Sequence, residues 1–436
     1  MYCGNCFRDN ALVTALRRLG HPTLLVPLYL PLTLEEPDAS AGTPIFFSGV
    51  NVYLEQKSPL FRASPGWLHD LLAAPKLLER VASFAAKTRP EDVGDLTLSM
   101  LRGEQGNQAR ELADLITWLR TQPKPDAICL SNGLLIGLVR RLRAELEVPV
   151  ACVLQGEDSF LDALPAHLRA EAWRTLGERA READALIAPS HYFAARMADR
   201  LNLSADRIRV VPNGINLDGF PVTSPAPPDA GAAPAPVLGY FARMCPEKGL
   251  DTLVGAFLEL KKRDRVKALT LRVGGGCGPA DEPFVERQRE RLRAQGLLGA
   301  VEFCPNLSRQ AKLLLLRSLT VFSVPALYGE AFGLYVLEAL AAGVPVVLPR
   351  HAAFPELIAA TGGGILCEPG DAIALADALE SLLLNPVAAR GLGAAGYQAV
   401  HHHYSATAMA NKLVQLFSEL TAARHPPPAP APVGAA

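Results

Sequence analysis

Short apolar runs alternate with helical periodicity along most of the chain. The runs at 126–130, 148–154, 185–189, 237–241 and 268–273 are typical of buried strands, and helical patterns separate them. Strands that alternate with helices in this way form parallel sheets, whose ligands bind beyond the carboxyl ends of the strands. The pattern therefore predicts an α/β fold.

The beginning of the chain departs from this alternation. Residues 7–19 have the pattern of an amphipathic helix that ends at Gly20, and residues 23–28 that of a strand. A doubly wound domain places a strand before its first helix, with the glycine-containing turn between them near the ligand. That first strand is missing here. We expect either that the natural chain starts upstream of Met1, which we favour, or that the domain has an open sheet edge.

The region that follows carries a weaker pattern. Residues 44–53 suggest one or two further strands, and residues 65–122 suggest helices separated by prolines. The apolar face of these helices, which includes Trp67, is interpreted as core packing. The wall of an acceptor pocket is the alternative interpretation.

The densest chemical pattern lies in a loop, a buried helix and a strand. The loop contains Pro325 and Gly329, the helix runs from about Gly333, and Gly343 ends it as a C′ glycine. A strand at 345–348 follows at once. The helix is apolar almost all the way round, so it is expected to be buried.

Two carboxylates occur in this segment. Glu338 lies in the middle of the apolar helix, where an acid rarely occurs without a partner. Glu330 lies just before the first turn, where the backbone N–H groups of Phe332, Gly333 and Leu334 would attract an anion. A ligand with both phosphate and hydroxyl groups fits this arrangement, since carboxylates accept hydrogen bonds from hydroxyls. The alternative is a solvated loop residue and a satisfied internal acid.

Two cations follow the strand at 237–241. Arg243 and Lys248 lie around a turn between that strand and a helix, where their side chains could converge on one diphosphate without a metal. The alternative is a pair of ordinary surface cations. The glycine run at 274–278 lacks the full spacing of a dinucleotide-binding turn, so it is weak evidence for a nicotinamide cofactor.

The first half of the chain contributes fewer polar signals. Gln155 follows the strand at 148–154, and a glutamine can bind a hydroxyl but cannot act as a general base. Glu157 and Asp158 after it would orient an acceptor or cap the next helix. Ser190 is expected to cap a helix, and Pro212-Asn213-Gly214 is expected to form a turn.

Composition limits the classes of function. A chain of 436 residues is too long for one ordinary core, so two domains are expected. A formal net charge of -1 argues against nucleic acid as the main partner. The chain shows no transmembrane run and no signal peptide, so we expect a cytoplasmic protein and leave peripheral membrane contact open. Cys3 and Cys6 have the spacing of a redox pair or half a zinc site, but neither context is complete, and their role stays open.

The two glutamates carry a resemblance to a known family. With seven residues between them, followed by Ala-Gly-Val-Pro-Val-Val and Pro355-Glu356, they resemble the donor-site signature of glycosyltransferase family 4. That family has the GT-B fold, with two Rossmann-like doubly wound domains facing across a cleft. Its members transfer a sugar from a nucleotide donor with retention of configuration. The resemblance implies catalytic roles for Glu330, Arg243, Lys248 and Gln155, and donor binding by Glu338, Phe332, Gly333, Leu334, Gly4 and Asn213.

The resemblance covers nearly the whole chain and implies its organisation. An acceptor-side domain (1–220) and a linker (221–236) would precede the donor domain (237–404), a helix packing back on the first domain (405–422) and a disordered tail (423–436). The implied enzyme is a hexosyltransferase that uses a nucleotide-diphosphate sugar and a hydroxyl acceptor, with no metal and no cofactor. A non-catalytic nucleotide-sugar binder and a nucleotide-sugar epimerase are the alternatives. The family's histidine near the donor sugar is Gln155 here, and Ala242 replaces a common glycine.

Overall fold

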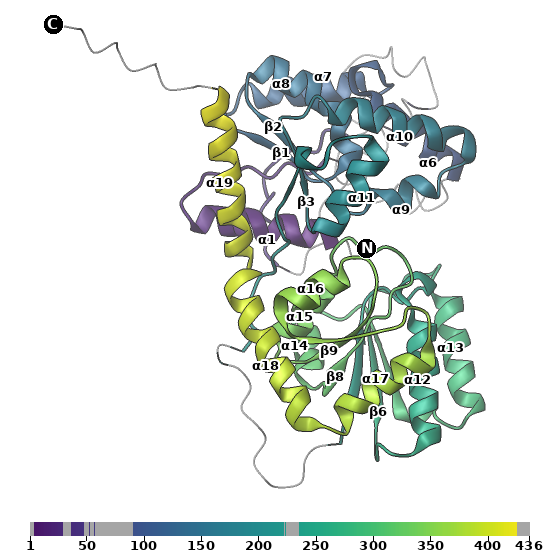
Figure 1. The fold of residues 1–436 in the computed structure, drawn as a ribbon. Helices are drawn as coiled ribbons and strands as arrows, with labels where there is room; N and C mark the ends of the chain where they lie inside the picture. The colour runs from purple at the N-terminus through teal and green to yellow at the C-terminus, as the bar shows by residue number, and fades with distance from the viewer. Residues whose placement is uncertain are drawn as a thin grey trace, which may run out of the picture.

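The protein has two α/β lobes, one above the other in Figure 1. The structure is a computed structural model, and it describes residues 4–28, 36–47, 52, 56, 90–221, 223 and 235–424. Each lobe is built on a parallel sheet with helices packed against it. The α/β prediction from the alternating apolar runs is therefore confirmed.

The N-terminal lobe has a sheet whose spatial order is the chain order, β1-β2-β3-β4. Every neighbouring pair in it is parallel. The central strands are completely buried because helices lie on both faces, which explains their continuous apolar sequence. The strands are β1 (Ile128–Leu130), β2 (Val150–Val153), β3 (Ala185–Ala188) and β4 (Ile208–Val210).

Helices surround this sheet. Ser190 caps α11 by accepting a hydrogen bond from the N–H of Phe193, as its sequence position predicts. The helical elements with described bounds in this lobe are α1 (Gly4–Arg18), α6 (Pro90–Arg102), η1 (Gly103–Gln105), α7 (Ala109–Leu119), η2 (Gly133–Leu138), α8 (Val139–Leu146), α9 (Glu157–Asp162), α10 (Ala166–Ala180), α11 (His191–Leu201) and η3 (Ala205–Arg207).

The C-terminal lobe has a six-stranded parallel sheet in the order β10-β9-β8-β5-β6-β7. The chain starts in the middle at β5, winds outward to β7, and then returns to β8 on the other side of β5. This is the doubly wound arrangement, in which ligands bind at the point where the winding reverses, here between β5 and β8. The strands are β5 (Val237–Phe241), β6 (Thr270–Gly275), β7 (Val301–Pro305), β8 (Val321–Phe322), β9 (Val346–Pro349) and β10 (Gly364–Cys367).

The helices of this lobe cover both faces of its sheet. The apolar helix α15 is buried as predicted, and Gly343 follows its end with φ 78 and the backbone hydrogen bonds of a C′ glycine. The helical elements are η4 (Pro246–Lys248), α12 (Leu250–Arg263), α13 (Glu282–Ala294), η5 (Leu298–Ala300), α14 (Arg309–Arg317), α15 (Leu334–Ala341), α16 (Phe354–Thr361), α17 (Ala372–Leu383) and α18 (Pro386–His403).

The last helix returns to the N-terminal lobe. After α18, the chain forms α19 (Ala406–Arg424), which lies beside α1 in Figure 1. Its apolar side packs on α1 through Ala410 and on the N-terminal sheet through Met409 and Leu413. The two lobes are therefore linked twice, at residues 211–237 and again at the start of α19.

Two predicted strands are wrong. Residues 23–28 and 44–47 belong to no strand, although Phe47 donates a backbone hydrogen bond to the carbonyl of Leu28 at 2.8 Å. Phe47 is buried and Leu28 packs against the same core. The apolar pattern thus reported burial correctly, but it could not show whether a neighbouring strand was there to pair with.

Three further expectations fall wholly or mainly outside the described residues. These are the second half of the 44–53 strand, the helices expected at 65–89, and most of the linker expected at 221–236. Cys3 and the tail beyond Arg424 also lie outside the described residues.

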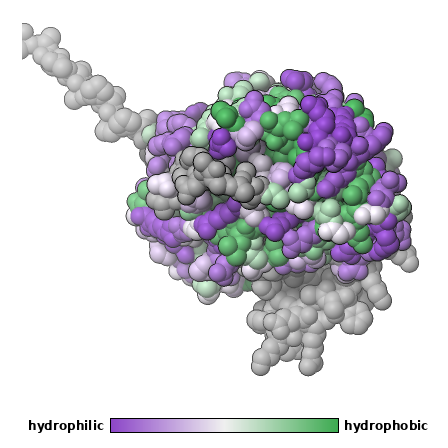
Figure 2. Space-filling model, turned by 90° about the horizontal axis from the view of Figure 1, so that it is seen from below, coloured by the Kyte–Doolittle hydropathy of each residue, from purple (hydrophilic) through white to green (hydrophobic). Residues whose placement is uncertain are grey.

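The outer face of the C-terminal lobe mixes hydrophilic and hydrophobic residues, as Figure 2 shows from below. The exposed large apolar side chains of this lobe include Ile373, Leu384 and Val387. None of the described helices is by itself long and apolar enough to cross a membrane. Only α17 and α18 taken together meet that length and composition, and the two are bent by 96°.

Candidate functional site

The switch point of the C-terminal sheet brings two loops together. The turn after β5 carries Lys248, and the loop after β8 carries Glu330. Gly249 has φ +72, and a Cβ on it would lie 1.9 Å from the carbonyl oxygen of Pro325 in the second loop. The N–H of Leu327 donates to the carbonyl of Glu247 at 2.9 Å. This close approach needs a glycine and places Lys248 against the Glu330 loop.

Lys248 and Glu330 form a mostly buried ion pair, with 2.5 Å between Nζ and Oε2. The hydroxyls of Tyr328 and Tyr335 each donate to the same carboxylate oxygen at 2.8 Å. The ammonium of Lys248 also contacts the Tyr328 hydroxyl and lies 4.8 and 5.0 Å from the two ring centroids. The other carboxylate oxygen, Oε1, has no partner among the described residues, so it remains available to accept hydrogen bonds from a ligand.

The electrostatics of Glu330 favour its charged form. Burial alone would raise the pKa of this carboxyl, but the charge of Lys248 and the hydrogen bonds from Lys248, Tyr328 and Tyr335 outweigh burial. The pKa of Glu330 therefore lies below its usual value. Burial and the nearby Glu330 charge raise the pKa values of both tyrosines, which stay protonated as donors.

A pH dependence of folding follows from the lowered pKa of Glu330. A carboxyl whose pKa is lower in the folded state adds stability above its unfolded pKa, and this is lost as the pH falls through the folded value. The stability advantage of the wild type over Glu330→Gln should therefore be full near pH 6 and shrink below about pH 4, close to the ordinary glutamate value. Urea unfolding of both proteins at several pH values measures it. An advantage that stays constant across this range would contradict the assigned ion pair.

Two helix N-termini meet beside this ion pair. Gly333 precedes α15 with φ 94, and the N–H groups of Phe332, Gly333 and Leu334 have no partner among the described residues. A Cβ on Gly4, the first residue of α1, would lie 3.8 Å from a methyl group of Leu334. Figure 1 shows the start of α1 above the C-terminal lobe. The N-terminal ends of both helices therefore lie close together, and their partial positive charges would stabilise a phosphate group placed beside them.

Glu338 has a partner that its sequence position did not indicate. Lys312 on α14 bonds Oε1 of Glu338 with its Nζ at 2.8 Å, and its side chain is almost fully buried. The same ammonium lies 5.7 Å from the ring of Phe241 at the end of β5. Glu338 thus faces the α14 side of the switch point, while Glu330 faces Lys248.

Arg243 is held by an acid outside the predicted set. Asp281, just before α13, accepts hydrogen bonds from Nε and Nη2 of Arg243 at 2.9 to 3.1 Å. Burial would raise the pKa of Asp281, but the hydrogen bonds from Arg243 and the Gly278 N–H lower it. Among the described residues, no side-chain hydrogen bond or ion pair joins Arg243 to Lys248 or gives their side chains a common partner. The expected convergence of the two cations on one group is therefore not visible without a ligand.

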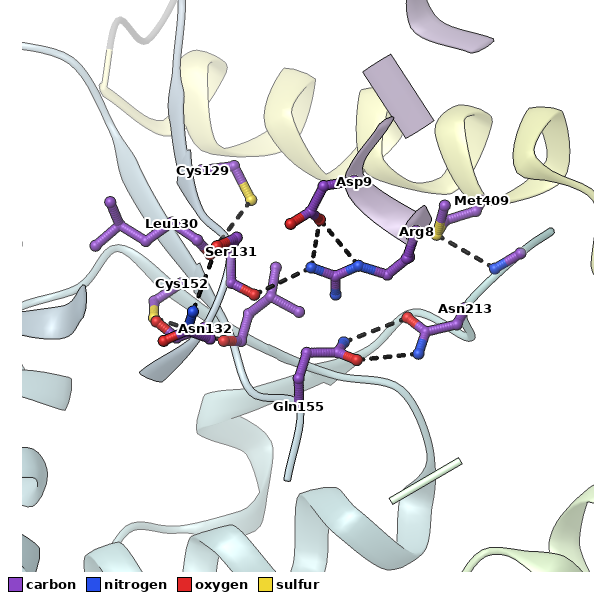
Figure 3. A network of polar contacts seen from close by, with 12 residues as sticks. Arg8, Asp9, Cys129, Leu130, Ser131, Asn132, Cys152, Gln155, Asn213 and Met409 are labelled. Carbon is purple, nitrogen blue, oxygen red and sulfur yellow. Dashed lines mark hydrogen bonds and ion pairs between the residues drawn. The ribbon is translucent and has the colours of Figure 1, made fainter. Parts of the chain in front are cut away.

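On the N-terminal side, Gln155 and Asn213 pair through both amide groups, at 3.1 and 3.3 Å (Figure 3). The expected turn at Asn213-Gly214 is absent. This backbone is extended and runs past Ser405, whose carbonyl would lie 2.3 Å from a Cβ on Gly214. The glycine permits a close approach between the two connections that link the lobes, and it makes no reversal.

The end of the N-terminal sheet is fixed by buried polar contacts. Glu157 accepts backbone hydrogen bonds from Gly133, Gln155 and Gly156 at 2.6 to 3.1 Å, so both of its carboxylate oxygens are engaged in holding two loops together. Arg8 of α1 bonds Asp9 and the carbonyl of Ser131 after β1 (Figure 3). These contacts fasten α1 over the carboxyl ends of the strands, and so they fix the place of Gly4.

The lobes touch directly beside the Glu330 loop. The hydroxyl of Ser190 donates to the carbonyl of Ala331 at 2.7 Å. Glu356 on α16 accepts from the N–H groups of His191 and Tyr192 at 3.0 and 3.1 Å, so it caps a helix of the opposite lobe. The described structure is thus a closed arrangement at this point, with the first turn of α11 against the Glu330 loop.

Sequence reasoning missed several members of the site. Tyr328 and Tyr335 are close to Glu330 in the chain, so a tyrosine on each side of a loop acid was an available signal. The other three had no local signal because their partners lie far away in the sequence; they are Asp281, Lys312 and Glu356 in its capping role.

Family models match both lobes. Residues 91–218 match the model described as Glycosyltransferase Family 4, and residues 230–399 match Glycosyl transferases group 1. The fold and the site together define a class of protein. It has two α/β lobes, and the switch point of one sheet suits a phosphate group. The chain belongs to glycosyltransferase family 4, with the GT-B fold.

Relatives and solved structures agree with this assignment. The chain is 33% identical over 223 residues to a phosphatidyl-myo-inositol mannosyltransferase of Mycobacterium leprae, which covers 49% of this chain and 54% of the relative. It is 30% identical over 265 residues to a D-inositol 3-phosphate glycosyltransferase of Xylanimonas cellulosilytica, which covers 58% of this chain and 61% of the relative. The matched segments thus span little more than half of these relatives.

The fold likeness extends further along the chain. The Anabaena protein HepE, solved in complex with UDP, superposes with a TM-score of 0.62 at 16% identity. The match covers 91% of this chain and 100% of HepE. At this identity the likeness shows the fold, and the choice of ligand rests on the residues of the site.

Proposed function

We propose that this protein is a retaining, metal-independent glycosyltransferase that moves a hexose from a nucleotide-diphosphate sugar to a hydroxyl acceptor. The observation that carries the proposal is the meeting of two helix N-termini beside the Lys248–Glu330 pair. This arrangement offers positive potential for a diphosphate and a carboxylate oxygen for sugar hydroxyls.

The proposed chemistry uses the site residues as follows. Lys248, Arg243 and the N–H groups of Phe332 and Gly333 would stabilise the departing diphosphate as its bond to the sugar breaks. Glu338 would hold the ribose, and Glu330 would hold the donor sugar. The acceptor hydroxyl would attack from the side of the leaving group. Gln155 cannot take a proton, so the acceptor's proton would pass to the departing phosphate oxygen.

The relatives suggest which acceptors to try first. Two of them are named for transfer to phosphatidyl-myo-inositol or D-inositol 3-phosphate, which are polyols that carry a phosphate. Such a polyol is the acceptor class we propose for this chain. The nucleobase and the sugar remain to be found by screening UDP-, GDP- and ADP-sugars.

Calorimetric titration of UDP, GDP and ADP in EDTA tests the donor site. One nucleotide should bind the wild type, and Glu338→Ala should weaken it by about ten- to a hundred-fold, as expected for lost hydrogen bonds to a charged group. Transfer without metal and without change of anomeric configuration should follow with that nucleotide's sugar. Absence of binding to a protein shown to be folded would remove the proposal. Binding without transfer to any acceptor would favour the non-catalytic alternative.

A further inference from the structure

One face of α11 carries a cationic side chain, Arg196, to the Glu330 loop. Tyr192, Arg196 and Arg200 are spaced four residues apart, so they share a face of this helix. Of these, Arg196 and Tyr192 reach the C-terminal lobe. A Cβ built on Gly329 would lie 2.5 Å from the Tyr192 hydroxyl and 3.9 Å from Cζ of Arg196. The guanidinium of the N-terminal lobe is thus next to the residue that precedes Glu330.

The position of Arg196 is set by a buried acid. Asp158 is fully buried on α9, and its Oδ2 accepts from Nε of Arg196 at 2.5 Å. The second oxygen of Asp158 is also buried and has no hydrogen-bond partner, so Arg196 is the only described side chain that pairs with this carboxylate. Because the bond uses Nε, it leaves both terminal nitrogens of Arg196 without a partner among the described residues.

One turn further along α9 and α11, a second ion pair serves as a structural comparison. Arg200 pairs with Asp162, which also accepts from the indole of Trp173 at 3.0 Å. The Arg200 guanidinium stacks on that ring at 4.4 Å. Arg200 therefore has its charge paired and its face covered, and it is one turn further from the loop than Arg196.

The free edge of Arg196 suits an oxyanion. A guanidinium with two open nitrogens matches the geometry of a phosphate, which it can bind with two parallel hydrogen bonds. Two acids, Asp158 and Asp162, act electrostatically on Arg196, and each of them is engaged in an ion pair with an arginine. The donor diphosphate is served by Lys248 and the helix termini, so an anion at Arg196 would belong to the other substrate.

We propose that Arg196 binds a phosphate group on the acceptor, with Asp158 as its positioning residue. The proposal rests on the proposed glycosyltransferase function and names the part of the acceptor that the N-terminal lobe would recognise. The Tyr192 hydroxyl lies on the same face and would donate a further hydrogen bond to the phosphate.

Inorganic phosphate is the probe for this site. The full-length protein is first saturated with the nucleoside diphosphate that binds it, so that the donor site is occupied. Phosphate is then titrated and its binding followed by the broadening of its ³¹P resonance, with wild type, Arg196→Gln, Arg196→Lys and the matched control Arg200→Gln. Nucleotide affinity and thermal unfolding are recorded for each variant.

We expect Arg196→Gln to weaken phosphate binding at least ten-fold, because charge-assisted hydrogen bonds are lost. Arg196→Lys keeps the charge opposite Asp158, so it should fold even if Arg196→Gln does not. It should still weaken phosphate binding, because lysine lacks the forked guanidinium, but less than Arg196→Gln does, because the charge remains. Arg200→Gln should bind phosphate like the wild type. Nucleotide affinity should not change in any of them.

Three results would overturn the inference. They are a wild type that binds no phosphate, Arg196 variants that bind it as tightly as the wild type, and an equal loss in Arg200→Gln, which would indicate general surface charge. Failure of every nucleotide to bind the folded wild type would instead remove the proposed function itself. The two failures are therefore distinguishable.

Discussion

Replacing Lys248 with methionine should lower the rate of sugar transfer by roughly two to three orders of magnitude, the usual cost of losing one preorganised electrostatic contact to a developing charge. Methionine keeps much of the apolar stem of lysine, so the packing between the Tyr328 and Tyr335 rings should survive. In the proposed chemistry, the lost ammonium would face the departing diphosphate. The loss should therefore appear mainly in kcat.

The measurement is steady-state transfer with the nucleotide sugar found by screening. Lys262→Met is a suitable control, because Lys262 lies in the same lobe and its side chain is 81% exposed. It should keep wild-type activity. A Lys248→Met enzyme within a few-fold of the wild type would place the diphosphate elsewhere and would leave the Lys248–Glu330 pair as a structural feature.

Gly249→Ala should destabilise the protein by about 3 kcal/mol and abolish the donor site. Two costs combine: a left-handed backbone costs a residue with a Cβ roughly 1–2 kcal/mol, and overpacking adds roughly 1–3 kcal/mol. The second cost is specific to this position, since the new Cβ would lie 1.9 Å from the Pro325 carbonyl oxygen. Relief of that contact requires the Lys248 turn to move away from the Glu330 loop.

Gly296→Ala separates the two costs. Gly296 also has a positive φ, +68, but a Cβ there would meet nothing within 4 Å. The Gly296→Ala variant should lose only the stability that the left-handed backbone costs, and its nucleotide binding should be unchanged. Urea unfolding and nucleotide titration of both variants give the comparison. Equal losses of stability, with nucleotide binding kept in both, would show that the approach of the two loops is not a constraint.

Local patterns predicted most of the C-terminal lobe. The strand at 237–241 has the predicted bounds, and the α15 helix ends where Gly343 allows a left-handed residue. Both features depend on residues that are neighbours in the chain. The N-terminal prediction did less well at 23–28, because an apolar run shows that a segment is buried but not whether another strand lies beside it.

The candidate site was predicted in part. Its carboxylates and cations were singled out because an acid inside an apolar helix, an acid just before that helix and two cations around a strand-to-helix turn are unusual. The pairing of Arg243 with Asp281 and of Glu338 with Lys312 was not predicted, since nothing in the sequence near either residue indicates its partner. The Asn213-Gly214 turn was wrong for a similar reason: the glycine makes room for a strand-like neighbour 191 residues later, at Ser405.

The sequence by itself determined the class of fold and the buried helix that contains Glu338 and follows Glu330. The kind of ligand that these residues suit stays a prediction. The tertiary structure decided which charges meet. Lys248 and Glu330 are 82 residues apart, and they touch because the winding of the sheet places β8 beside β5 and aligns the loops that follow both strands. Arg196 reaches the same loop from the other lobe, where Ser190 and Glu356 hold α11 against it. Strand order and lobe contact are global properties, which depend on the packing of every element at once.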